Sequence, residues 1–292
     1  MSRLEVLKTY KLYIGGQFPR TESGRYYVPK NAKQEALGNI CLSSRKDVRN
    51  AVSAARKAMA WSERTAFNRG QILYRIAEML EGRKAQFIEE LKLQGASPKA
   101  AEAEVNVAID RIVYYAGWCD KYQQILGSVN PVASSHFNFS VPEPTGVVGI
   151  VCPEDTSLVG LVSLVLPVIC GGNTCVVLAS ESLPLCAITL AEVLHSSDLP
   201  GGVVNILTGS KKELVPTLAS HMDVNAILYG DTNADQYKAL CLLAAENVKR
   251  VAQIAKDWSQ PEQHDLYQIA ETLEIKTTWH PIENIGGASS GY

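Results

Sequence analysis

Four short apolar runs rich in β-branched residues constrain the fold of this chain more than any other feature. Helix-length segments separate them, and they occupy residues 147–151, 174–178, 203–207 and 226–229. Continuous apolar runs of this length are typical of strands buried on both faces, as in a parallel sheet. Because parallel strands need crossover connections, the intervening segments are expected to be right-handed helical crossovers. The pattern therefore predicts an α/β fold with a doubly wound parallel sheet.

The N-terminal third is expected to be mainly helical. Ser44 and Asp47 form a capping-box pattern ahead of an apolar stripe that continues to about Trp61. Similar stripes predict further helices around residues 72–80, 87–91 and 105–116. Before the first helix, Gly15-Gly16 lies between two apolar segments, which predicts a β-hairpin with residues 26–28 as another strand of the same ribbon.

Composition and charge exclude several classes of protein. The chain has 292 residues, 46% of them hydrophobic, and a formal net charge of -2. Such a balance does not favour nucleic acid or an anionic membrane, and the most apolar stretch, residues 158–168, is too short to span a bilayer. The seven cysteines form no Cys-x-x-Cys pair, so no metal site is expected. They fit reduced thiols of a cytoplasmic protein.

The order and spacing of several motifs are similar to the aldehyde dehydrogenase superfamily. Residues 143–153 closely resemble that family's E-P-x-G-V-V-G-x-I-x-P segment. The register continues without a gap through residues 172–174, 199–205 and 221–224, and the resemblance covers about residues 12–254. It implies a Rossmann-like coenzyme-binding domain with a helical N-terminal part. The family's catalytic cysteine domain would follow residue 254, and it is missing here.

The positions that the resemblance assigns to chemistry are degenerate. The family's asparagine that stabilises the oxyanion aligns with Asp155, and its general-base glutamate aligns with Ile254. A carboxylate has no N–H to donate, and losing one such donor costs about 3 to 4 kcal/mol of transition-state stabilisation. Isoleucine cannot accept a proton. Cys152, beside the first of these positions, is interpreted as a core residue and not as a replacement nucleophile.

The coenzyme contacts implied by the resemblance are also reduced. The family's lysine that binds the adenine ribose aligns with Leu178, and only its partner Glu181 remains. Asp231 replaces a glycine of the turn that approaches the pyrophosphate, where its charge would repel a diphosphate. Glu181 is therefore either a vestigial ribose ligand or a polar residue at the end of a strand. The pair Lys211-Lys212, in place of a glycine-rich turn, is interpreted as a solvated loop.

The sequence predicts a β-flap apart from the core. Residues 134–142 and 275–279 both alternate polar and apolar side chains, and the resemblance suggests that they pair. Phe137, Phe139 and Trp279 are the expected interface residues of its aromatic surface. The predicted division is a coenzyme-domain-like core of residues 1–133 and 143–262, a flap of residues 134–142 and 272–281, and a flexible tail of residues 282–292. Deleting residues 272–292 is expected to leave the core folded.

The functional hypothesis is a pseudoenzyme domain that contributes oligomerisation, scaffolding or partner docking. Its organisation resembles the noncatalytic C-terminal module of two-module family 16 aldehyde dehydrogenases. The expected partners are a second copy of the chain, an aldehyde dehydrogenase module or another protein, and no cofactor is expected. The alternatives are a regulatory domain that binds NAD(H) weakly through Glu181, or part of an NAD-dependent oxidoreductase whose catalytic residues lie in another module.

Overall fold

The chain is described by a computed structural model that covers residues 6–260 and 262–282. At its centre lies a five-stranded sheet in which every neighbouring pair of strands is parallel. The strand order is β10-β9-β6-β7-β8. The strands are β6 (Val147–Val151), β7 (Thr174–Leu178), β8 (Val204–Leu207), β9 (Ala226–Tyr229) and β10 (Arg250–Gln253). The α/β class and the four strands predicted from apolar runs are confirmed.

The sequence does not predict the fifth strand, β10. Its two end residues, Arg250 and Gln253, are exposed, and the two residues between them are half-buried. This polarity follows from its position, because β10 lies at the edge of the sheet and pairs only with β9. A mixed run of four residues carries no clear strand pattern, so the edge strand could not be distinguished from a loop.

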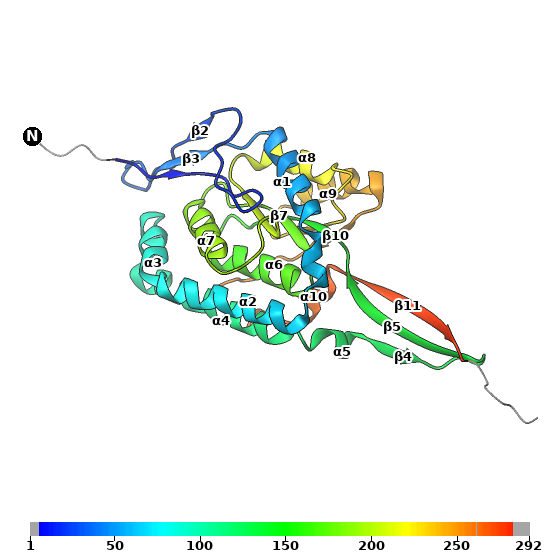
Figure 1. The fold of residues 1–292 in the computed structure, drawn as a ribbon. Helices are drawn as coiled ribbons and strands as arrows, with labels where there is room; N and C mark the ends of the chain where they lie inside the picture. The colour runs from blue at the N-terminus through cyan, green and yellow to red at the C-terminus, as the bar shows by residue number, and fades with distance from the viewer. Residues whose placement is uncertain (1–5, 261, 283–292) are drawn as a thin grey trace, which may run out of the picture.

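Helices cover both faces of the sheet (Figure 1). One face carries α6 (Val159–Cys170) and α7 (Leu185–His195), and the other carries α1 (Arg45–Lys57), α8 (Lys211–Ala219) and α9 (Ala234–Ala244). A further layer lies over α6 and α7: α2 (Ala66–Gly82), α3 (Lys84–Leu93) and α4 (Pro98–Trp118). Each face of the sheet thus has its own apolar core. Within the described residues, no helix combines the length and hydropathy needed to cross a membrane.

The predicted capping box begins α1. The Ser44 side chain accepts a hydrogen bond from the Asp47 N–H, and the Asp47 carboxylate accepts one from the Ser44 N–H at 2.8 Å. The helix ends at Lys57, however, and a separate 3₁₀ turn, Met59–Glu63, carries Trp61. The Trp61 indole donates to the carbonyl of Ile169 at 2.8 Å, so a contact with α6 fixes this turn.

The predicted hairpin at Gly15-Gly16 is confirmed, but the prediction that residues 26–28 belong to the same ribbon is wrong. Ile14 and Gln17 form a single bridge, and Tyr13 pairs with Ile206 of β8. Gly16 lies so close to Gly201 that a Cβ atom would come within 2.8 Å of its Cα. The glycine turn is therefore used for packing against the core. Instead of joining this ribbon, β2 (Tyr26–Tyr27) pairs with β3 (Asn39–Cys41), which also pairs with β1 (Thr9–Tyr10).

A three-stranded antiparallel flap extends from the body as an arm (Figure 1). Its strands, in the order β11-β5-β4, are β11 (Leu273–Pro281), β5 (His136–Pro144) and β4 (Ser128–Asn130). The short helices α5 (Tyr122–Leu126) and α10 (Tyr267–Ala270) precede β4 and β11. The predicted pairing of the two alternating segments is confirmed, with Thr277 opposite Ser140. The third strand, β4, is too short to show a pattern in the sequence.

The register of the flap separates its aromatic side chains. Trp279 lies opposite Asn138, whereas Phe139 lies opposite Thr278. Side chains directly opposite share a face and neighbours along a strand do not, so Trp279 is on one face and Phe137 and Phe139 are on the other. The expected single aromatic surface is therefore wrong. The expected packed face of β11 is not packed in the single chain either, because every residue after Leu273 in this strand is exposed.

The predicted flexible tail lies almost entirely outside the described residues. Only Ile282 is described, and its N–H donates to the Ser135 carbonyl at 3.0 Å. Its backbone is thus still fixed to the flap at the start of the expected tail.

Candidate functional site

The order of the sheet reverses between β6 and β9, and a crevice lies at this point. From β6 the chain adds β7 and β8 on one side, then returns to add β9 and β10 on the other. In open α/β sheets, ligands bind beside such a switch point, at the carboxyl ends of the strands. The crevice has a volume of about 280 Å³. It is lined by Pro153, Glu154, Asp155, Gly230, Asp231, Thr232, Ala255, Lys256 and Trp258.

The Glu154 side chain links the loop after β6 to the loop after β7. Its carboxylate accepts hydrogen bonds from the N–H groups of Glu181 at 3.0 Å and Ser182 at 2.9 Å. The hydroxyls of Ser180 and Ser182 donate to it at 3.0 and 2.6 Å, and the Lys211 ammonium pairs with it. Burial opposes ionisation, but Lys211 and Ser182 outweigh this effect and lower the pKa of Glu154. The carboxylate is therefore charged at neutral pH.

Lys211 is buried, which corrects its interpretation as part of a solvated loop. It begins α8 and is 6% exposed, whereas Lys212 is exposed. Its ammonium contacts the Glu154 carboxylate and donates to the Cys152 carbonyl. Nothing local in the sequence indicates this pair, because Glu154 lies in the loop after β6 and Lys211 lies at the start of α8. The Lys211 ammonium can be buried because the Glu154 carboxylate and the Cys152 carbonyl offset the cost of removing it from water.

Glu181 caps α8 in the folded chain. Its carboxylate accepts a hydrogen bond from the Lys211 N–H at 3.0 Å, at the helix end where the dipole favours negative charge. Its carbonyl accepts one from the Tyr27 hydroxyl at 3.3 Å. The side chain of Glu181 is exposed. A role in binding a ribose remains a prediction, and it would compete with this cap.

The crevice does not fit NAD in this arrangement. Glu154 and Asp155 follow β6, and Asp231 follows β9, so three carboxylates line the place where a diphosphate would lie. Asp155 is exposed, and the Asp231 carboxylate accepts only the N–H of its neighbour Thr232 at 2.7 Å. The negative charges of these carboxylates would repel a diphosphate placed in the crevice. Leu178, at the end of β7, is 1% exposed and belongs to the apolar core, so it offers no polar atom.

Neither Ile254, aligned with the general base, nor Cys152, beside the oxyanion position, offers a base or an activated nucleophile. Ile254 follows β10, is buried, and donates its N–H to the Tyr229 carbonyl at 2.9 Å. Cys152 is buried at the end of β6, and burial raises the pKa of its thiol to about 12 despite the nearby Lys211. It therefore stays protonated at neutral pH, as expected for core packing. No cluster of three potential metal ligands occurs in the part of the chain that the structure describes.

A buried arginine fixes the segment that follows β10. Arg111 of α4 donates to the Ser163 hydroxyl and to the carbonyls of Trp258 at 2.9 Å and Gln260 at 2.6 Å. Trp258 is buried and lines the crevice. Sequence reasoning missed Arg111, because a single arginine on an amphipathic helix is usually a surface residue. The crevice is thus closed on one side by a rigid segment.

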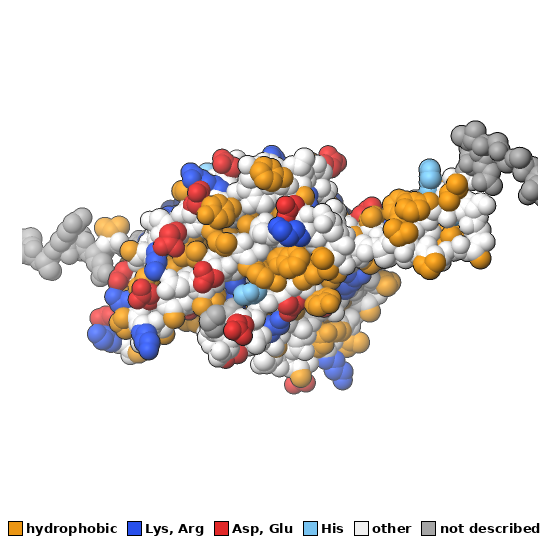
Figure 2. All heavy atoms as spheres, turned by 90° about the horizontal axis from the view of Figure 1, so that it is seen from below, with side chains coloured by type: hydrophobic (Ala, Val, Ile, Leu, Met, Phe, Trp, Pro, Cys, Tyr) orange, Lys and Arg blue, Asp and Glu red, His pale blue; other side chains and the backbone are white. Residues whose placement is uncertain are grey.

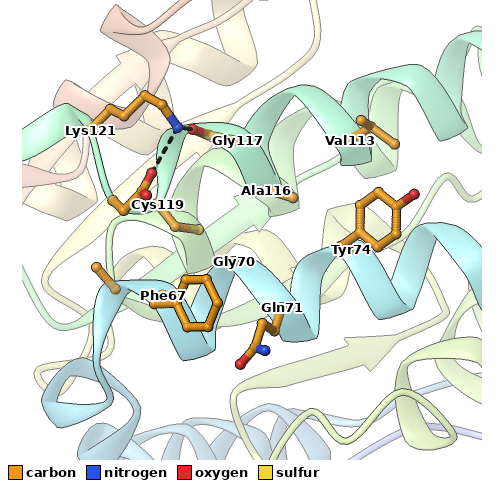
Figure 3. Close-up of a pocket in the computed structure, with 11 residues that line it drawn as sticks. Phe67, Gly70, Gln71, Tyr74, Val113, Ala116, Gly117, Cys119 and Lys121 are labelled. Carbon is orange, nitrogen blue, oxygen red and sulfur yellow. Dashed lines mark hydrogen bonds and ion pairs between the residues drawn. The ribbon is translucent and has the colours of Figure 1, made fainter.

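A larger groove of about 450 Å³ lies between α2 and α4, away from the crevice (Figure 3). Apolar side chains such as Phe67, Tyr74 and Val113 line it. Its charged groups, Lys121 and Asp120, pair with each other at 2.9 Å. Its thiol, that of Cys119, is buried and donates to the Tyr115 carbonyl at 3.5 Å, so neither the charges nor the thiol assigns chemistry to the groove.

Comparison with known proteins identifies the family. The model of the "Aldehyde dehydrogenase family" matches residues 18–253. The chain is 32% identical to mouse cytosolic 10-formyltetrahydrofolate dehydrogenase over 260 residues, which are 86% of this chain and 29% of that protein. It is also 32% identical to mouse retinal dehydrogenase 2 over 254 residues, which are 84% of this chain and 48% of that protein.

Comparison with solved structures also finds aldehyde dehydrogenases. An NAD⁺ complex of an aldehyde dehydrogenase from Bacillus cereus superposes with a TM-score of 0.80 and 26% identity, covering 84% of this chain and 50% of that chain. The present chain spans half or less of the length of the curated relatives it matches. The matched region includes the parallel sheet and the crevice loops up to the end of β10. This chain therefore belongs to the aldehyde dehydrogenase family.

Proposed function

We propose that this chain is a catalytically inactive module of the aldehyde dehydrogenase family that acts in oligomerisation, scaffolding or partner docking. The observation that carries the proposal is the flap, which extends β5 and β11 away from the body (Figure 1). Its outer strand β11 buries little surface within its own chain, because every residue of the strand after Leu273 is exposed. Such a surface is typical of an interface with another subunit or module.

Both the faces and the edge of the flap support docking. Figure 2 shows apolar side chains gathered on this arm. Trp279 and Ile275 are exposed on one face, and Phe137 and Val129 are exposed on the other. Among the described strands, β11 pairs only with β5, which leaves its outer edge available for a further strand. Unpaired edges readily accept a strand from a neighbour, and buried tryptophans often dominate association energies.

Inactivity is supported by the positions that should carry chemistry. Asp155 cannot donate to an oxyanion, and Ile254 cannot act as a base. The matched region covers half or less of each catalytic relative, and the described chain passes from β10 through a short segment into β11. An active site in this family member would therefore need groups from another chain or module.

Trp279→Ala tests the docking role. Loss of a central aromatic contact is expected to weaken self-association, or docking to a catalytic aldehyde dehydrogenase module, by about 2 kcal/mol or roughly 30-fold in Kd. Tyr26→Ala is a matched control, because Tyr26 is also exposed but lies in β2, at the opposite end of the molecule. Light scattering measures the mass of each variant, and titration calorimetry measures docking. Unchanged values for Trp279→Ala in both assays would contradict the proposal.

A regulatory domain that binds NAD(H) weakly is the second candidate. It is favoured by Glu181, which the family resemblance assigns to the adenine ribose of the coenzyme and which is exposed beside the start of α8. A third candidate is a part of an NAD-dependent aldehyde oxidoreductase whose catalytic residues lie elsewhere, which the partial coverage of the relatives favours. A cytoplasmic location accords with the relative named as cytosolic and with the unpaired thiols of the seven cysteines.

A further inference from the structure

The donors around Glu154 have the composition of an anion-binding pocket. Two consecutive backbone N–H groups, those of Glu181 and Ser182, point at one carboxylate. The hydroxyls of Ser180 and Ser182 complete a loop of donors, and Ser180 is 3% exposed. Consecutive backbone N–H groups and hydroxyls in such a loop are a common cradle for phosphate and carboxylate oxygens.

A buried cation lies at the base of this cradle. The Lys211 side chain is 7% exposed, and its ammonium reaches both Glu154 and the Cys152 carbonyl. Without an anion, the Lys211 charge would lie buried against a carbonyl alone, which is costly. The Glu154 side chain itself is 34% exposed, so it reaches into the pocket from the solvent side. Ser180 and Lys211 thus form the buried base of the pocket, and the exposed residues Glu181 and Ser182 complete it at the surface.

We propose that the donors around Glu154 form an oxyanion pocket for a phosphate or carboxylate group, and that Glu154 occupies this pocket as an internal ligand. The pocket lies at the carboxyl ends of β6 and β7, next to the crevice at the switch point of the sheet. An external anion must displace a carboxylate that is tethered to the pocket at high effective concentration. The oxyanion pocket is therefore filled by a side chain of the chain itself.

Glu154→Ala, with inorganic phosphate as the probe, tests the proposal. Removing the internal carboxylate should empty the pocket while its donors and Lys211 remain. Phosphate at about ten times its Kd should then raise the Tm of the variant by about 3 °C or more beyond its effect on the wild type, at matched ionic strength against chloride. The wild-type protein reports the general stabilisation by phosphate, because its pocket is already filled.

Two matched variants distinguish the pocket from general charge effects. Asp155→Ala removes a neighbouring exposed carboxylate and should respond to phosphate like the wild type. Adding Lys211→Met to Glu154→Ala removes the cation and should abolish the extra stabilisation. If Glu154→Ala does not accumulate as folded protein, the yield on refolding in phosphate against chloride replaces the Tm, and a higher yield in phosphate supports the pocket. An equal response of Glu154→Ala and Asp155→Ala, or no response of either, would overturn the proposal. These outcomes are independent of the flap, so they leave the docking proposal untouched.

Discussion

Lys211 and Glu154 show how two ordinary surface residue types become structural when the fold brings them together. Their ion pair joins the loop after β6 to the start of α8, and Glu181 adds a cap to the same helix. The identities of Asp155 and Ile254 could be interpreted from the sequence, because the ability to donate or accept a proton belongs to the residue type. The ion pair could not, because it depends on which loops meet in space.

Lys211→Met should destabilise the folded chain. It leaves the Glu154 carboxylate without its cation, at a cost of about 2 kcal/mol at neutral pH, below the range for fully buried pairs because Glu154 is partly exposed. Lys212→Met, one residue along and exposed, is the control and should change the free energy of unfolding little. Urea unfolding measures both. Equal losses for the two variants would contradict a structural role for the pair.

The same variant should change the response to acid. The folded chain lowers the pKa of Glu154, so the stability that this group contributes is present above its unfolded pKa of about 4.3. That contribution is lost as the pH falls through the lower folded pKa. Without Lys211 the pKa is lowered less, so the free energy of unfolding should fall less steeply below about pH 5. Parallel pH profiles for wild type and Lys211→Met would rule this out.

NAD should bind more weakly than about 1 mM, which corresponds to less than about 4 kcal/mol of binding free energy. Leu178 removes one donor, Asp231 and Asp155 place negative charge along the crevice, and Glu154 already occupies the donors beside it. Titration calorimetry at physiological salt measures this affinity. A micromolar Kd would favour the regulatory NAD(H)-binding alternative.

At the scale of elements, the sequence predicted the helices and strands that have a clear local pattern of residues. The apolar runs of β6, β7, β8 and β9 and the capping box of α1 are all present. The glycine turn at Gly15-Gly16 forms the predicted hairpin, in which Ile14 and Gln17 exchange backbone hydrogen bonds, but β2 pairs with β3 and does not join it. Edge strand β10 and short strand β4 lack enough residues to show a period. Pairing by alternation placed β11 beside β5, yet only the register reveals that Trp279 and Phe139 face opposite ways.

The flap should be removable, but not at the boundary expected from the sequence. Thr272 and Leu273 are buried, and the Thr272 carbonyl accepts hydrogen bonds from the Thr145 hydroxyl and the Asn173 side chain, both at 2.8 Å. Deleting residues 275–292 should therefore leave the core folded and weaken association. Deleting residues 272–292 should destabilise the core by about 2 to 4 kcal/mol, because it removes a buried leucine and leaves polar groups unpaired.

Thermal unfolding followed by circular dichroism compares the two truncations. A lower Tm only for the longer deletion is the expected result. Equal Tm values would show that Thr272 and Leu273 do not belong energetically to the core.

At the scale of the whole molecule, the chain has the fold of its family, and the proposed loss of catalysis can be tested directly. The purified chain is expected to show no NAD- or NADP-dependent oxidation of aliphatic aldehydes. Asp155 and Ile254 lack the required proton chemistry, and the thiol of Cys152 is buried and protonated. Absorbance of the reduced coenzyme measures turnover. Turnover that Cys152→Ser abolishes would overturn the assignment as inactive.

The anchoring of Thr272 also defines a path for mechanical load. If a partner pulls on β11, the first contacts to be strained are the separate backbone hydrogen bonds between β11 and β5. The next contacts along the chain are at Thr272, whose carbonyl accepts hydrogen bonds from the side chains of Thr145 and Asn173. Asn173 also accepts the Gly146 N–H at 2.8 Å, immediately before β6. Force applied to the arm is thus transmitted through Asn173 to Gly146, immediately before the central strand β6.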